Sequence, residues 1–132
     1  MTLNPEPSLL DAARDAMRRA YAPYSHFRVG AAVRSSSGAV YVGCNIENAS
    51  YGATVCAERV AVAAMVASGD RAWTEIAIAS EADPPATPCG ICLQVLVEFA
   101  IEGRILLAGP NGCRETSLGA LLPDPFVLRQ NT

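Results

Sequence analysis

The sequence predicts an α/β fold: a three-layer α/β/α sandwich with a mixed sheet of about five strands. Two patterns predict this class. A first helix is followed by two apolar strands at 27–33 and 39–45, and helices then alternate with strands, an order typical of a sheet covered on both faces. One segment is also apolar without interruption from Val60 to Ala67, which indicates a helix buried between layers or at an interface. The Pro-rich loop at 81–88 is too short for an interdomain linker, so we expect residues 1–132 to form one domain.

The first helix is expected to begin after Ser8, a candidate N-cap with Asp11 three residues on, and to end at Pro23. The strands at 27–33 and 39–45 are expected to form a hairpin, because a Ser-Ser-Gly turn joins them and alternation places Phe27 on a core face. The other elements follow in chain order. They are a loop at 45–54, a helix that opens at 54–59 and ends near Ser68–Gly69, a strand at 74–80, a helix from Cys89 to about 100, a strand at 103–109, a turn at 110–116 and a short helix within 117–126.

Composition argues against several classes of partner. The formal net charge is −3 and no basic run occurs, so we expect no nucleic-acid partner. No stretch has the length of a transmembrane helix, and the first ten residues lack the pattern of a secretion signal, so we expect a cytoplasmic protein without a membrane partner. Five cysteines, an odd number, indicate metal binding, catalysis or core packing rather than a disulfide framework.

Three of these cysteines stand at predicted helix beginnings. Cys89 and Cys92 are three residues apart, so their sulfurs share one face near free backbone N–H groups, and Cys56 opens the preceding helix. Helix N-termini favour thiolates, the form that binds zinc. Three protein ligands would leave one tetrahedral position open, which is the arrangement of a catalytic zinc site.

Two charged residues at the head of the apolar helix fit this interpretation. Glu58 lies two residues from Cys56, on a different helix face, so we expect it to act as a general acid and base rather than as a ligand. Arg59 lies three residues from Cys56 and can donate hydrogen bonds to thiolates, offsetting the negative charge of three sulfurs around one dication.

The alternatives are a Cys-x-x-Cys pair in the core, a redox pair, and a non-catalytic zinc-stabilised scaffold. The combination of Cys-Ala-Glu with Pro-Cys-x-x-Cys, each opening a helix, favours a zinc-dependent deaminase.

Four blocks of sequence then resemble, in order and over nearly the whole chain, the small homotetrameric cytidine deaminases. The blocks are YSHFRVGAAV, GCNIENASYGATVCAERVA, PCGICLQVLVEF and LLPDPF. The resemblance implies a cytidine deaminase-like fold and hydrolytic deamination of cytidine and 2′-deoxycytidine to uridine and 2′-deoxyuridine, with release of ammonia, in pyrimidine salvage. It also implies one Zn²⁺ per subunit, and a Glu58 that moves protons between the zinc-bound water, the ring nitrogen and the leaving amino group. A related aminohydrolase of another cytosine-bearing small molecule is an alternative, as is, less favoured, a polynucleotide deaminase.

The resemblance further implies residues that contact the substrate. Asn45 and Glu47 match the ribose-binding pair, and two residues apart in extended chain they would face the same way, although an exposed strand exit would explain them equally. Phe27 matches an aromatic near the base, whereas its alternation favours a core role. The resemblance assigns Ala49, Tyr51 and Phe126 to a neighbouring subunit's site, so a homotetramer would share its active sites; a tail anchor is the alternative for Phe126.

One departure from the resemblance stands beside the cysteines. Leu93 follows Cys92 where relatives commonly have arginine, which removes a cation from the thiolates. Cys44 is expected to be a buried apolar residue and Cys113 to lie in a turn, neither with ligand spacing. His26, the only histidine, lies outside the motifs and is interpreted as structural.

Overall fold

The computed structural model describes residues 8–128 and places them around one five-stranded mixed sheet of order β2-β1-β3-β4-β5. The sheet is antiparallel except where β3 pairs with β4, as predicted for a mixed sheet. Its elements are α1 (Leu9–Met17), β1 (Val29–Ser35), β2 (Val40–Cys44), η1 (Tyr51–Ala53), α2 (Ala57–Ala67), β3 (Trp73–Ser80), α3 (Gly90–Phe99), β4 (Ala100–Ala108), β5 (Cys113–Ser117) and α4 (Leu118–Leu121).

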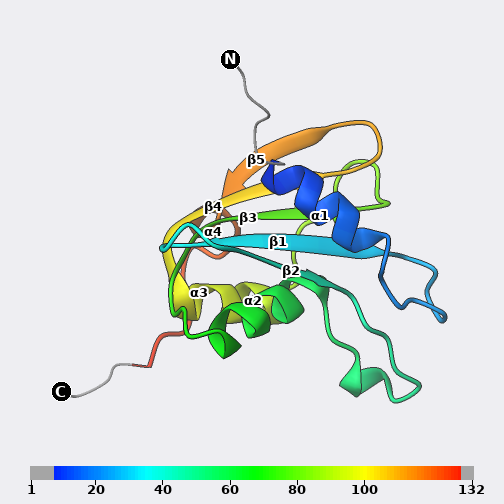
Figure 1. Ribbon diagram of the computed structural model, residues 1–132, viewed down its shortest axis with the longest axis horizontal. Coiled ribbons are helices and arrows are strands. Elements are labelled where there is room, and N and C mark those ends of the chain that lie inside the picture. The colour runs from blue at the N-terminus through cyan, green and yellow to red at the C-terminus, as the bar shows by residue number, and fades with distance from the viewer. Residues whose placement is uncertain (1–7, 129–132) are drawn as a thin grey trace.

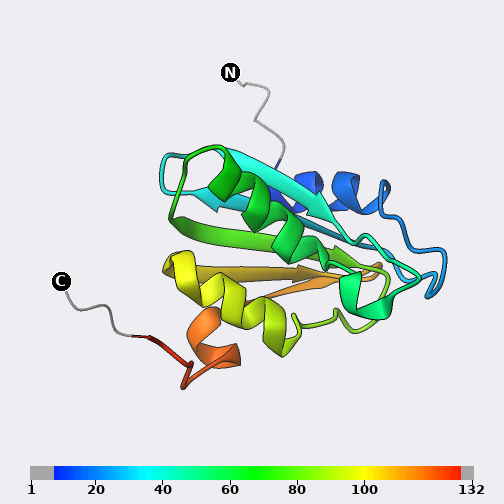
Figure 2. The ribbon, with the colours of Figure 1, turned by 90° about the horizontal axis from the view of Figure 1, so that it is seen from below.

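The helices cover both faces of the sheet, which confirms the three-layer α/β/α class (Figure 1). Helix α1 packs on one face over a core of small side chains that includes Ala13, Ala32 and Ala77. Helices α2 and α3 lie side by side on the other face, over a larger core that includes Met65, Trp73 and Leu96 (Figure 2). The apolar run from Val60 to Ala67 lies in α2, an outer-layer helix that buries Ala61, Val62 and Met65 but exposes Ala63 and Ala67, so this chain does not bury the helix between layers. Within residues 8–128, no helix is both long and apolar enough to span a bilayer.

The first helix begins as predicted but ends earlier. The Ser8 Oγ accepts a hydrogen bond from the Asp11 N–H at 3.1 Å, which confirms Ser8 as the N-cap. The helix stops at Met17 rather than Pro23, because the Tyr21 N–H is bound to the Asn45 carbonyl at 3.0 Å and the Tyr21 carbonyl accepts from the Glu47 N–H at 2.9 Å. Tyr21, which would continue the helix, therefore forms its backbone hydrogen bonds with the segment after β2 instead. The first seven residues, on which the expectation of no export signal partly depends, lie outside the described part of the chain.

Two strand predictions were wrong in detail. The strand expected from Phe27 begins at Val29 and is buried on both faces, since β1 is central and covered by α1 and α2, so alternation did not identify its core face. The predicted turn at 110–116 instead leads into β5, an edge strand paired with β4 from Cys113 to Ser117. Its exposed, mostly polar residues carry no hydrophobic signal. Cys113 is exposed in β5, and Cys44 is half-buried at the end of β2.

Candidate zinc and catalytic site

The structure brings the three predicted cysteines together. Cys56 is the N-cap of α2, Cys89 is the N-cap of α3, and Cys92 lies in the first turn of α3. Their sulfur atoms all lie within 4.8 Å of one another. Helices α2 and α3 run side by side in the same direction, so their N-terminal ends lie at the same end of this layer (Figure 2).

The thiols of this cluster lie close enough to shift one another's pKa. A hydrogen bond from Cys92, together with a hydrogen bond from Arg59 and the charge of Arg59, lowers the pKa of Cys56 to about 5 against the opposing effect of burial. The pKa of Cys92 is raised because its thiol keeps the proton that it donates to Cys56 and because it is buried. Sulfur donors at this spacing fit Zn²⁺, for which thiolates are preferred ligands, and three of them leave one tetrahedral position open.

Arg59 faces the sulfurs, as predicted. Its Nη2 lies 3.5 Å from the Cys56 Sγ, and this interaction raises the pKa of Arg59. Its Nε is the one buried side-chain nitrogen or oxygen in residues 8–128 that has no hydrogen-bond partner. Leu93 supplies no second cation: its side chain is buried in the core between the sheet and the helices.

Glu58 lies beside the cluster and is only 5% exposed. Burial raises the pKa of Glu58 to about 7, and the negative charge of Cys56 adds to the rise. A carboxyl group that titrates near neutral pH can both take up and release a proton, which is what general acid–base catalysis requires.

Glu58, Cys56 and Cys89 line one cavity with a volume of about 270 Å³. The cavity lies at the carboxyl end of β3, where Ile78 and Ser80 form part of its wall, and the loop before α3 contributes Thr87. The carboxyl ends of strands in an open α/β sheet are where ligands commonly bind.

Phe27 also lines this cavity and is 37% exposed, so the interpretation of Phe27 as a core residue was wrong. It lies before β1, in the loop from α1, where no partner strand fixes the alternation of side chains. The resemblance, which assigned Phe27 to the neighbourhood of the base, identified its position better than periodicity did.

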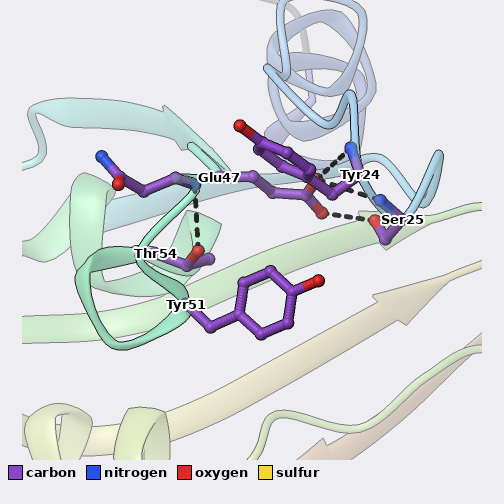
Figure 3. Close-up of a pocket in the computed structure, with 6 residues that line it drawn as sticks. Tyr24, Ser25, Glu47, Tyr51 and Thr54 are labelled. Atoms are coloured by element: carbon purple, nitrogen blue, oxygen red, sulfur yellow. Dashed lines mark hydrogen bonds between the residues drawn. The ribbon is translucent and has the colours of Figure 1, made fainter.

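Asn45 and Glu47 line the same cavity, as their two-residue spacing in extended chain predicts. Both are already engaged within the chain. The Asn45 amide accepts from the Val29 N–H and donates to the Phe27 carbonyl, both at 2.9 Å. Glu47 accepts from the N–H groups of Tyr24 and Ser25 at 2.9 and 3.1 Å and also from the Ser25 hydroxyl (Figure 3). These hydrogen bonds lower the pKa of Glu47, and the bond from the Ser25 hydroxyl contributes most.

A second cavity of about 400 Å³ adjoins the first, sharing Ser25, Glu47 and Thr54 with it. Tyr24 and Tyr51 flank it, with ring centroids 6.4 Å apart in an edge-to-face arrangement (Figure 3). Tyr51 is 78% exposed and belongs only to this outer cavity.

Two residues of the predicted set lie away from both cavities of their own chain. Ala49 is exposed in the loop before η1, and Phe126 is 71% exposed after α4. The Phe126 carbonyl accepts a hydrogen bond from the Gln94 amide at 2.8 Å, which ties the tail to α3.

Sequence reasoning did not identify Ser25, Thr54 or Thr87 as site residues. Thr54 had a usable signal, because it precedes Cys56 by two residues in extended chain and shares its face. Ser25 and Thr87 lie in loops whose paths depend on tertiary contacts, and no local pattern marks them.

Comparison with known proteins assigns this site to a family. A family model described as the cytidine and deoxycytidylate deaminase zinc-binding region matches residues 4–108. Cytidine deaminase of Sporosarcina psychrophila is 40% identical over 120 residues, covering 89% of this chain and 88% of that protein. This chain belongs to the cytidine and deoxycytidylate deaminase family.

Solved structures agree with this assignment. Cytidine deaminase of Burkholderia pseudomallei superposes with a TM-score of 0.84 at 45% identity, covering 89% of this chain and 96% of that chain. The enzyme of Mycobacterium tuberculosis gives a TM-score of 0.77 at 41% identity, covering 91% and 95%. The expected cytidine deaminase-like fold is therefore confirmed, and Zn²⁺ is the cofactor of this deaminase domain.

Proposed function

We propose that this protein is a cytidine deaminase that hydrolyses cytidine and 2′-deoxycytidine to uridine and 2′-deoxyuridine, releasing ammonia. The observation that carries the proposal is a cluster of three sulfurs, two of which line a cavity of about 270 Å³ together with one buried carboxyl group. The names of its relatives, which are cytidine deaminases, support the same substrate.

Each residue of the site has a role in this chemistry. Cys56, Cys89 and Cys92 would hold the zinc, and the chemistry that zinc supplies when bound is Lewis acidity that activates water near neutral pH. Glu58, with a pKa of about 7, would pass one proton of the attacking water to the ring nitrogen, and would then pass the remaining proton of the newly added hydroxyl group to the leaving amino group. Arg59 would offset the negative charge of the sulfurs through its contact with Cys56.

The proposed substrate contacts use the hydrogen-bonding groups of the cavity residues that have no partner within the chain. Asn45 keeps one N–H and one lone pair, and Glu47 keeps an acceptor site on Oε2, after the hydrogen bonds within the chain are counted. These groups could bind sugar hydroxyls, while Phe27 would contact the base. Ala49, Tyr51 and Phe126 would act on a neighbouring subunit's site.

We also propose a homotetramer with shared active sites, working in pyrimidine salvage in the cytoplasm. Large apolar side chains stand exposed in two places that could meet other subunits: Ile91 at the start of α3, and the tail from Phe126 to Leu128. Light scattering of the zinc-loaded protein should give four times the mass of the chain, and a monomer would contradict shared sites.

Turnover of cytidine by the zinc-loaded protein, followed as a loss of absorbance when cytidine becomes uridine, tests the activity itself. Glu58→Gln tests the role of the carboxyl group, and we expect it to lower kcat by about 10²- to 10⁴-fold, since general acid–base catalysis contributes on that order. Metal analysis should still find zinc, because Glu58 is not a ligand. The matched control is Glu98→Gln, which removes an exposed carboxylate of α3 and should leave kcat unchanged. Full activity in Glu58→Gln would contradict the proton-transfer role.

A further inference from the structure

The loop from Tyr24 to Val29 carries Phe27 to the cavity, and side chains rather than a helix or sheet hold it there. Its backbone N–H groups are all bound. The acceptors are Glu47 Oε1 for Tyr24 and Ser25 (2.9 and 3.1 Å), the Ala22 carbonyl for His26 (3.0 Å), Ser25 Oγ for Phe27 (3.0 Å), Glu81 Oε1 for Arg28 (2.8 Å) and Asn45 Oδ1 for Val29 (2.9 Å). Five of these six N–H groups donate to side-chain oxygens, and only the His26 N–H donates to a backbone carbonyl. Individual side chains therefore determine the path of this loop.

Ser25 links the carboxylate of Glu47 to the backbone of Phe27. Its hydroxyl donates to Glu47 Oε2 (Figure 3). The same hydroxyl oxygen accepts from the Phe27 N–H at 3.0 Å. A hydroxyl has one hydrogen and two lone pairs. Because the hydrogen is donated to Glu47, the Ser25 oxygen can act only as an acceptor toward the Phe27 N–H.

The backbone between these two residues is in a conformation that needs such support. His26 has φ 58°, and it is the one non-glycine residue with positive φ in the described range 8–128. A left-handed residue is unfavourable for an L-amino acid, so it persists where surrounding contacts hold it. It turns the chain so that the Phe27 N–H points back to the Ser25 side chain.

Phe27 is held at its other backbone polar atom as well, since its carbonyl accepts from the Asn45 amide at 2.9 Å. Its ring lines the cavity that contains Cys56 and Glu58. We propose that Ser25 is a positioning residue for substrate binding: through the Phe27 N–H, its hydroxyl sets the place of the Phe27 ring against the base. This inference rests on the proposed function, in which that cavity receives cytosine.

A double-mutant cycle tests whether Ser25 acts on substrate binding through Phe27. Ser25→Ala leaves the Phe27 N–H without its acceptor, and we expect KM for cytidine to rise about tenfold, while kcat changes far less because Glu58 and the cysteines are untouched. Ser25→Thr keeps the hydroxyl and should restore KM. In a Phe27→Ala background, Ser25→Ala should raise KM no further, since the ring that it positions is gone. Additive effects of the two substitutions would overturn the proposal, because they would show that Ser25 acts by another route.

Ser37→Ala is a matched control. Its hydroxyl also donates to a carboxylate, Asp70 Oδ2 at 3.0 Å, but in the turn between β1 and β2 rather than at the cavity. KM should be unchanged in this variant.

Amide hydrogen exchange at Phe27 provides a readout that does not depend on turnover. Exchange should be faster in Ser25→Ala than in the wild type, and unchanged in Ser37→Ala; equal rates in Ser25→Ala and the wild type would overturn the proposal. A wild-type protein that fails to deaminate cytidine would refute the proposed function instead, and the exchange measurement would still test whether the Ser25 hydroxyl holds the Phe27 N–H.

Discussion

Gly43 sets how closely α2, which carries the proposed general acid and base Glu58, can approach the sheet. A Cβ added at Gly43 would lie 2.5 Å from the Ala61 nitrogen, 2.6 Å from the Ala57 oxygen and 2.9 Å from the Val60 Cβ. The shortest of these distances is about 0.9 Å below the 3.4 Å at which ordinary van der Waals contact begins. Two of the three atoms are backbone atoms of α2, so the helix itself would have to move in a Gly43→Ala variant.

The displacement should affect both stability and catalysis. Overpacking of this kind costs about 1–3 kcal/mol, so we expect the free energy of unfolding to fall by about 2 kcal/mol. Since Cys56 and Glu58 lie at the start of the same helix, a shift approaching 1 Å should also lower kcat/KM for cytidine by about 100-fold.

Urea denaturation followed by circular dichroism, together with kcat/KM measured where both proteins are folded, separates the two effects. The matched control is Gly119→Ala in α4, where an added Cβ would meet no atom within 4 Å. That variant should be as stable as the wild type, or slightly more stable because alanine restricts the unfolded chain. A Gly43→Ala variant with wild-type stability and activity would refute the argument that direct backbone packing places α2.

Two further predictions concern loops away from the zinc ligands. Hydrogen bonds, first from Tyr41 and then from Ser35 and Ser37, lower the pKa of Asp70. Its contribution to stability should therefore be complete above the unfolded-state pKa of about 4 and be lost as pH falls through the lower folded-state pKa. In urea denaturation from pH 7 to pH 3, the stability difference between wild type and Asp70→Asn should shrink below about pH 4, and a constant difference would contradict this role. At His26, whose φ is 58°, His26→Val should lower the free energy of unfolding by about 1–2 kcal/mol relative to His26→Gly, and equal stabilities of the two variants would exclude left-handed strain.

The clustering of the candidate zinc ligands, with Glu58 beside them, was predictable from the sequence because most of their arrangement is local. Cys89 and Cys92 share a helix face by spacing alone, and Cys56 and Glu58 lie within one turn of a predicted helix start. Residue spacing does not show that the two helix starts lie close together in space. The α/β/α order of elements favours this proximity. The deaminase signature then identified the pair of motifs as one site.

The residues that shape the rest of the cavity were harder to predict. Phe27 was assigned to a core face because alternation was extended two residues beyond the true start of β1. The edge strand β5 was missed because it is exposed and mostly polar, so no burial pattern marks it. Asn45 and Glu47 were placed in the correct cavity, but their hydrogen bonds to the loop from Tyr24 to Val29 depend on residues about twenty positions away.

The sequence by itself determined the fold class, the helix beginnings at the three cysteines and the carboxyl group beside them, because each depends on the chemistry and spacing of near neighbours. Only the tertiary structure decided how deeply Glu58 is buried, which raises its pKa toward neutrality, and how Ser25, Asn45 and Glu47 hold Phe27 at the cavity. Burial and long-range hydrogen bonds arise from the packing of distant segments against one another, and no local pattern of residues encodes that packing.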